Sequence, residues 1–141
     1  MLVNVSYNDR KIIDRIDREV GLPFSLKEQW SLGGTGSPKL FIVGSSEHID
    51  KLLLLDNNTN SCNIEMRPKG IIVRFRSLLE TYALIVPYYK LRLLKTGLGI
   101  YTIYHDQYFI KVRADTKAIQ KYFTKLLGHR ADNVPPTMED L

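Results

Sequence analysis

Residues 71–76 read IIVRFR, and this run carries the clearest structural signal in the chain. Isoleucine, valine and phenylalanine favour β-strands, and successive side chains of a strand point to opposite faces of its sheet. Every second residue from Ile71 onward is apolar, whereas Arg74 and Arg76 lie on the opposite face. The run therefore predicts a strand with one apolar face and one basic face.

Similar segments precede and follow this run at intervals of about 8–12 residues, with turn-forming residues between them. The expected strands are residues 63–67, 71–76, 81–86, 90–95, 100–104 and 108–113. A short polar turn separates the last two, which predicts a hairpin. A succession of this kind is typical of an antiparallel sandwich or barrel.

A C-terminal amphipathic helix is predicted after these strands, over residues 116–127. Apolar side chains recur in it at i, i+3, i+4, i+7 and i+8, which places them on one helix face. Asp115 is the expected N-cap and Gly128 the expected stop. We expect its apolar face to cover the open side of the sheet.

An N-terminal helix is predicted over residues 9–20, with Asn8 or Asp9 as its N-cap and Gly21 at its end. The fold class predicted for the chain is therefore α+β. It is an antiparallel β-rich sheet or bent barrel with an N-terminal helix and a closing C-terminal amphipathic helix. We expect residues 1–128 to form a single domain and residues 129–141 to form a mobile tail.

The segment between the first helix and the strand region has a weaker pattern. Residues 33–38 predict a flexible loop because they combine three glycines with a proline, and residues 39–43 predict a short strand. Residues 45–55 fit either a helix or a strand, since four successive leucines suit neither period. Residues 57–61 predict a polar loop.

The order of elements over residues 63–128 resembles a bacterial pleckstrin-homology-like domain. The similarity lies in GIIVRFR at 70–76, YALIVPYYKL at 82–91, the hairpin after them and the closing amphipathic helix. In that superfold such a helix plugs one open end of a bent barrel. The resemblance implies a binding or scaffold module, carries over no ligand residues and does not include the first 62 residues.

The net charge of +5 is concentrated in the strand region, where residues 63–113 hold nine Lys or Arg against three Asp or Glu. The alternation predicts that five of these cations share the outer sheet face: Arg74, Arg76, Arg92, Lys111 and Arg113. One interpretation is a solvated face whose cations prevent strand edges from pairing with other chains. The other is a site for an anionic partner, namely phospholipid headgroups, nucleic acid or an acidic peptide.

The remaining candidates for chemistry favour structural explanations. The glycine-rich loop lacks the phosphate-loop pattern, because a proline separates its serine from the lysine and a strand follows. His48, His105 and His129 have no partner at metal-ligand spacing and are expected at the surface. Cys62 has no basic neighbour and is expected to be inert. No catalytic or cofactor motif is present in the sequence.

These patterns favour a non-catalytic binding or scaffold module with an unknown protein or anionic ligand as its partner. Peripheral binding to an anionic membrane surface or to nucleic acid through the basic strand face is the alternative. An enzyme with an unrecognised site is a third hypothesis. The single cysteine and the lack of a signal peptide or of about 20 consecutive apolar residues predict a cytoplasmic chain without a membrane span. A free edge strand could pair with a second copy to give a homo-oligomer.

Overall fold

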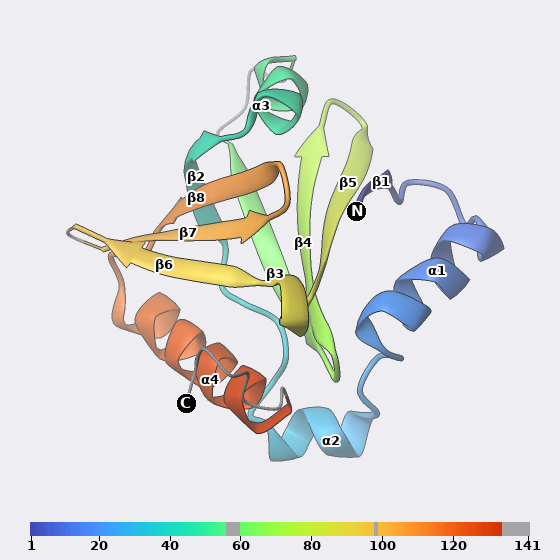
Figure 1. The fold of residues 1–141 in the computed structure, drawn as a ribbon, viewed down its shortest axis with the longest axis vertical. Coiled ribbons are helices and arrows are strands. Elements are labelled where there is room, and N and C mark those ends of the chain that lie inside the picture. The colour runs from blue at the N-terminus through green and yellow to red at the C-terminus, as the bar shows by residue number, and fades with distance from the viewer. Residues whose placement is uncertain (56–59, 98, 134–141) are drawn as a thin grey trace.

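The computed structural model describes residues 1–55, 60–97 and 99–133, and Figure 1 shows their arrangement. The elements are β1 Leu2–Asn4, α1 Arg10–Val20, α2 Leu26–Ser31, β2 Leu40–Ser45, α3 Glu47–Leu54, β3 Ser61–Arg67, β4 Gly70–Ser77, β5 Glu80–Pro87, a 3-10 turn Tyr88–Lys90, β6 Arg92–Thr96, β7 Ile100–His105, β8 Tyr108–Arg113 and α4 Lys117–Asn133. The first helix, the C-terminal helix and the strand succession are confirmed.

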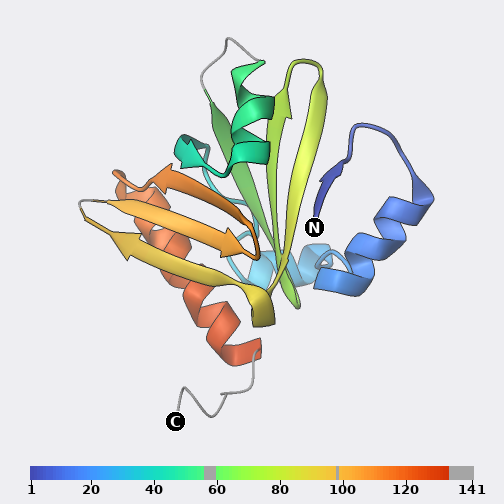
Figure 2. The ribbon, with the colours of Figure 1, turned by 45° about the horizontal axis from the view of Figure 1, so that its top comes forward.

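The strands form one antiparallel sheet of eight in the order β1-β5-β4-β3-β2-β8-β7-β6. β2 joins its two halves, because Leu40 and Phe41 pair with β3 whereas Ile42 to Ser45 pair with β8. The register shifts between Ile42 and Gly44, and such a bulge bends a strand and increases its twist. Strands β3 to β5 consequently run across the direction of β6 to β8 (Figures 1 and 2). The predicted α+β fold class is confirmed.

The main core lies between the inner faces of the two sheet halves. The alternation predicted for β4 is confirmed, since Ile71, Val73 and Phe75 all belong to this core. Helix α3 contributes Ile49 and Leu53 to it. Helix α4 adds four buried side chains, which are Ile119, Tyr122, Phe123 and Leu126. The C-terminal helix thus covers the core as expected.

A second, smaller core lies on the outer face of the sheet, where α1 packs. Ile16 and Val20 of α1 contact a patch formed by Ile72, Ala83 and Ile85. The expectation that this outer face is wholly solvated is therefore wrong for β4 and β5. Strand β4 is apolar on both faces near its start, and its cations, Arg74 and Arg76, follow Ile72, the residue of β4 on which α1 packs.

Gly70 permits the close approach of α1 to the sheet. A Cβ atom at this position would lie 2.5 Å from Val20 Cγ1 and 2.4 Å from the carbonyl oxygen of Val86. Both separations are shorter than real Cβ contacts. The absence of a side chain at Gly70 therefore sets the distance between α1 and the sheet.

Several segments differ from their prediction. Helix α2 and strand β1 were not expected, and α2 owes its N-terminus to a capping box between Ser25 and Glu28. Of residues 45–55, which fit either a helix or a strand, Glu47–Leu54 form the helix α3, whereas Ser45 ends strand β2. The strand expected at 90–95 begins two residues later because a 3-10 turn precedes it. Of the loop expected at 57–61, residues 57–59 lie outside the described residues and Ser61 already belongs to β3.

Helix α4 is capped by Thr116, whose Oγ1 accepts a hydrogen bond from the Ile119 amide at 3.2 Å, and not by Asp115. The helix also continues past Gly128 to Asn133. The last turn is held by Arg130, which donates to the carbonyl oxygens of Tyr88 and Leu91. The tail predicted from residue 129 is therefore helical up to Asn133, and the rest of it lies outside the described residues.

Strands β1 and β6 are the two edges of the sheet, and pairing of an edge with a second copy stays a prediction. Within the described ranges, no helix combines the length and the apolar character needed to cross a membrane.

Candidate anion-binding site

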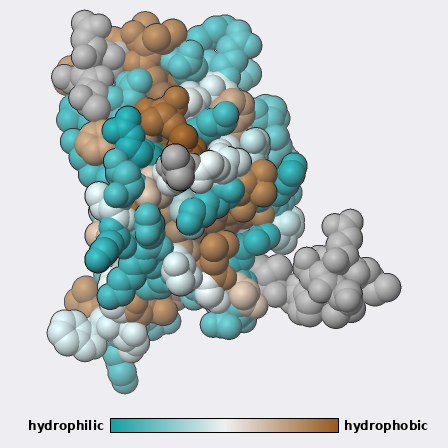
Figure 3. Space-filling view, turned by 90° about the vertical axis from the view of Figure 1, so that its left-hand side faces the viewer, coloured by the Kyte–Doolittle hydropathy of each residue, from teal (hydrophilic) through white to brown (hydrophobic). Residues whose placement is uncertain are grey.

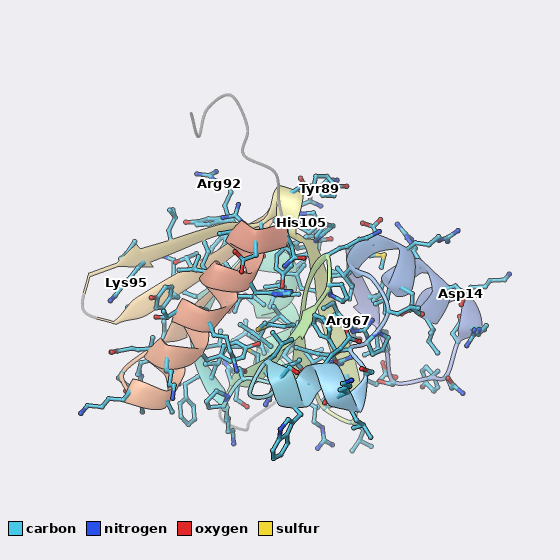
Figure 4. All side chains as sticks on the ribbon, turned by 90° about the horizontal axis from the view of Figure 1, so that it is seen from below. Asp14, Arg67, Tyr89, Arg92, Lys95 and His105 are labelled. Atoms are coloured by element: carbon cyan, nitrogen blue, oxygen red, sulfur yellow. The ribbon has the colours of Figure 1, made fainter. Side chains whose placement is uncertain are left out.

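The five predicted cations all lie on the outer face of the sheet but fall into two groups. Arg74 and Arg76 stand on β4, whereas the other three stand on β6 and β8, beyond the bend in β2. Figure 4 labels Arg92 at β6 and Arg67 of β3 near α1, well apart from each other. The five residues therefore do not form one cluster, because the bulge in β2 turns the second half of the sheet away from the first.

Two of the three cations on β6 and β8, Arg92 and Lys111, lie beside aromatic rings. In register, Arg92 is opposite Tyr104, which in turn is opposite Phe109. The Arg92 guanidinium lies 5.5 Å from the Tyr104 ring centroid, and Lys111 Nζ lies 5.8 Å from that of Phe109. Such cation–π contacts stabilise by about 0.5–1 kcal/mol at exposed sites. Arg92 and Lys111 are thus each partnered by an aromatic ring of the same half of the sheet.

The cations on β4 border a hollow of about 220 Å³, which we call the anion hollow. Its lining residues are Ser61, Asn63, Arg74, Phe75, Arg76 and Thr81. Two guanidinium groups, one amide and two hydroxyls can donate hydrogen bonds into it, and this lining includes no carboxylate. Guanidinium groups match the planar, bidentate geometry of phosphate and carboxylate oxygens. The hollow is therefore equipped to hold an anion.

A network of ion pairs fixes Arg74 at the edge of this hollow. Glu65 accepts a hydrogen bond from Arg74 Nη1 at 2.7 Å and another from Arg67 Nε. Arg67 in turn reaches α1, where its Nη1 lies 3.2 Å from Asp17 Oδ1 and 2.8 Å from the carbonyl oxygen of Gly21. Because Arg67 is only 7% exposed, the network is largely shielded from water. It links α1, β3 and β4 into one support for Arg74.

Arg74 borders three hollows among the described residues. Besides the anion hollow, it lines one of about 330 Å³ beneath α1. It also lines one of about 450 Å³, here called the loop hollow, which reaches Phe24, Gln29 and the loop at residues 35–37. The loop is held against β3, since the Ser37 amide donates to the Ile64 carbonyl oxygen at 2.8 Å. The predicted glycine-rich loop thus forms a wall of the loop hollow and is not part of the anion hollow.

The Glu65 carboxyl has a pKa below its usual value. Burial alone would raise it, but the hydrogen bonds and positive charges of Arg67 and Arg74 lower it by more. Because the folded-state pKa lies below the unfolded one, Glu65 contributes stability above the unfolded pKa of about 4.3. That contribution is lost as the pH falls through the folded pKa.

We expect the free energy of unfolding of Glu65→Gln to depend less on pH in acid than that of the wild type. The wild-type chain should lose stability more steeply than the variant as the pH falls from about 5 to below about 4, because only the wild type must protonate this carboxylate. Urea unfolding measured at several pH values tests this. Glu80→Gln, a second carboxylate on the strand region, is the matched control. Parallel profiles for wild type and Glu65→Gln would contradict the assigned role.

The other residues considered for chemistry lie elsewhere. His105, expected at the surface, is only 4% exposed, because it lies on the same face of β7 as the core residues Tyr101 and Ile103. His48 is exposed and His129 is half-buried. Cys62 lies in β3, and burial raises the pKa of its thiol to about 12. Within the described chain, no three His, Cys, Asp or Glu residues are grouped as a metal site would require.

Sequence reasoning missed most of the polar lining of the site. The sequence pattern predicts Ser61 in a loop and indicates for Asn63 and Thr81 only that they belong to strands. The available signal was the alternation in β3, which places Ser61, Asn63 and Glu65 on the same face as Arg74 once the two strands pair. The pairing itself could not be derived from one sequence.

No protein-family model, curated protein or solved structure matches this chain. The resemblance to a pleckstrin-homology-like domain therefore stays a prediction.

Proposed function

We propose that this chain is a non-catalytic binding module that holds a phosphate-bearing anion in the anion hollow. The observation that carries the proposal is the composition of the lining, which offers guanidinium, amide and hydroxyl donors and no carboxylate. An anion in this position would accept hydrogen bonds from charged donors, which are about twice as strong as those from neutral ones.

The spacing of the two arginines supports this function. Residues i and i+2 of a strand lie on one face about 7 Å apart, so Arg74 and Arg76 can approach one tetrahedral anion from two sides. Glu65 accepts from only one nitrogen of Arg74, which leaves its other donors available. Arg76 is exposed and forms no ion pair within the described residues. Arg74 is thus the positioned group, and Arg76 adds the uncompensated charge.

We expect Arg76→Gln to weaken the binding of glycerol 3-phosphate at least about tenfold, since a hydrogen bond to a charged group contributes about 1.5–3 kcal/mol. Isothermal titration calorimetry at low and high salt measures the effect, and wild-type affinity should fall with salt. Arg92→Gln is the matched control, because it removes the same charge from the other half of the sheet. It should change the affinity less than twofold.

Two results would overturn this function. Loss of affinity in Arg92→Gln but not in Arg76→Gln would move the anion site to β6 and β8. Binding of a single-stranded oligonucleotide by a chain that does not bind glycerol 3-phosphate would favour nucleic acid as the partner. We place the module in the cytoplasm, because its one cysteine is buried and unpaired, as suits a reducing compartment.

A further inference from the structure

Helix α2 and the segment before it expose large apolar side chains to solvent. Trp30 is 88% exposed, Leu26 is 85% exposed and Leu22, just before the helix, is 67% exposed. Leu26 and Trp30 are four residues apart, so they lie on the same face of α2. We call these three residues the apolar patch. Single exposed leucines are ordinary. A tryptophan grouped with two leucines is typical of a surface that contacts a membrane or another protein.

A stripe of lysines lies beside the apolar patch. Lys117, Lys121 and Lys125 follow one another at intervals of four along α4, which places them along one side of the helix. Lys125 Nζ donates to the carbonyl oxygens of Gly33 and Gly34 at 3.3 and 2.9 Å, just after α2 ends. These bonds bring the Lys125 end of the stripe against the C-terminal end of α2, and Lys121 and Lys117 follow along α4 away from it. Helices α2 and α4 lie near each other in Figures 1 and 4.

The surroundings of the apolar patch are basic. Helix α4 contains one carboxylate, Asp132, against three lysines and Arg130, and it lies near the end of the helix at which the His129 ring packs on Phe24. The carboxylate of α2, Glu28, is occupied in the capping box with Ser25. Figure 3 shows hydrophilic side chains over much of the side of the molecule on which α4 lies, with apolar ones at its lower end. The patch is therefore complementary in charge to an anionic surface.

The apolar patch is also continuous with the anion hollow. Leu26 and Trp30 line a hollow of about 570 Å³ that includes Gln29. Gln29 also lines the loop hollow, which shares Asn63 and Arg74 with the anion hollow. Apolar side chains, lysines and the anion hollow consequently occupy adjoining parts of one surface.

We propose that this surface docks on a bilayer containing anionic phospholipids. Leu26 and Trp30 enter the interfacial region, the α4 lysines face the headgroups, and the anion hollow receives a headgroup phosphate. Tryptophan and leucine beside cations are the side chains that lie favourably at such an interface, and each nearby lysine adds attraction to the anionic leaflet. The inference rests on the proposed function, because it names the lipid headgroup as the source of the phosphate.

Trp30 allows a direct test, because it is the one tryptophan in the sequence. With vesicles of phosphatidylcholine and phosphatidic acid, its fluorescence should shift to shorter wavelength and should be quenched by brominated acyl chains. Both effects should weaken with salt and be absent with pure phosphatidylcholine. Leu26→Ser, which keeps the reporter, should reduce vesicle binding at least fivefold. Leu79→Ser is the matched control, because Leu79 is an equally exposed leucine on the turn between β4 and β5. This substitution should leave vesicle binding unchanged.

The calorimetric titration with glycerol 3-phosphate separates failure of this inference from failure of the proposed function. If the soluble ester binds but Trp30 emission is unchanged by anionic vesicles, the membrane inference is wrong and the binding function stands. If neither ligand binds, both are wrong. A shift of Trp30 emission with protein concentration alone, without vesicles, would identify the apolar patch as a contact between copies and overturn the inference. Circular dichroism of Leu26→Ser shows whether the variant is folded, so that a loss of vesicle binding can be separated from unfolding.

Discussion

Replacing Phe123 by alanine is expected to lower the free energy of unfolding by about 3–5 kcal/mol. Phe123 is fully buried and stacks on Tyr101 of β7, with 4.1 Å between the ring centroids and 9° between the ring planes. Its removal leaves a cavity where α4 meets β7 and abolishes this aromatic pair, which contributes about 0.5–1.5 kcal/mol beyond burial. The side chain thus joins the C-terminal helix to the second half of the sheet.

Urea unfolding followed by circular dichroism measures the effect of Phe123→Ala. Leu127→Ala is the matched control, since Leu127 lies one turn further along α4 and is 38% exposed. Leu127→Ala should lower the free energy of unfolding by about 1 kcal/mol. Equal losses in the two variants would show that α4 is not attached to the sheet through Phe123. If the m-value, the slope of the free energy of unfolding against urea concentration, is unchanged, both variants still unfold in one cooperative transition.

Replacing Arg67 by methionine is expected to lower the free energy of unfolding by about 3 kcal/mol, as removal of one partner from a buried ion pair does. Arg67 bonds to Asp17, Glu65 and the carbonyl oxygen of Gly21. Methionine fills part of the volume but leaves both carboxylates without this partner. Because Asp17 belongs to α1, the variant should also weaken the attachment of that helix to the sheet.

Arg74→Met is the matched control for stability, because Arg74 shares Glu65 with Arg67 but has 39% of its side chain exposed. It should cost about 1 kcal/mol, as partly exposed pairs do. Hydrogen exchange of the α1 amides distinguishes the two variants, since only Arg67→Met should lower protection in that helix. If Arg67→Met is as stable as the wild type, the network is not what holds α1 near the site.

The strands from β3 to β8 could be predicted because their signal is local, whereas the three-residue strand β1 could not. In β4 the alternation of Ile71, Val73 and Phe75 with Arg74 and Arg76 fixes which side chains face the core, whatever the partner strand is. The amphipathic pattern of α4 similarly indicates which face is buried. These features follow from the period of the backbone and need no knowledge of tertiary contacts.

The site could not be predicted because it depends on pairing and packing between distant residues. Ile72 lies among the outward residues of β4, yet α1 covers it, and only contacts with Ile16 and Val20 show this. The separation of Arg74 from Lys111 depends on a bulge in β2 with no clear sequence signal. Gly128 should end a helix by propensity, but contacts of the following Arg130 outweigh that preference.

The central claim is that an anion occupies the hollow between Arg74 and Arg76. Two-dimensional ¹⁵N NMR of the wild-type chain during titration with inorganic phosphate tests it without any substitution. We predict saturable shifts of the Asn63, Arg74 and Arg76 amides, with those of Arg92 and Lys111 unmoved. Shifts confined to β6 and β8, or no saturable shift at all, would contradict the claim.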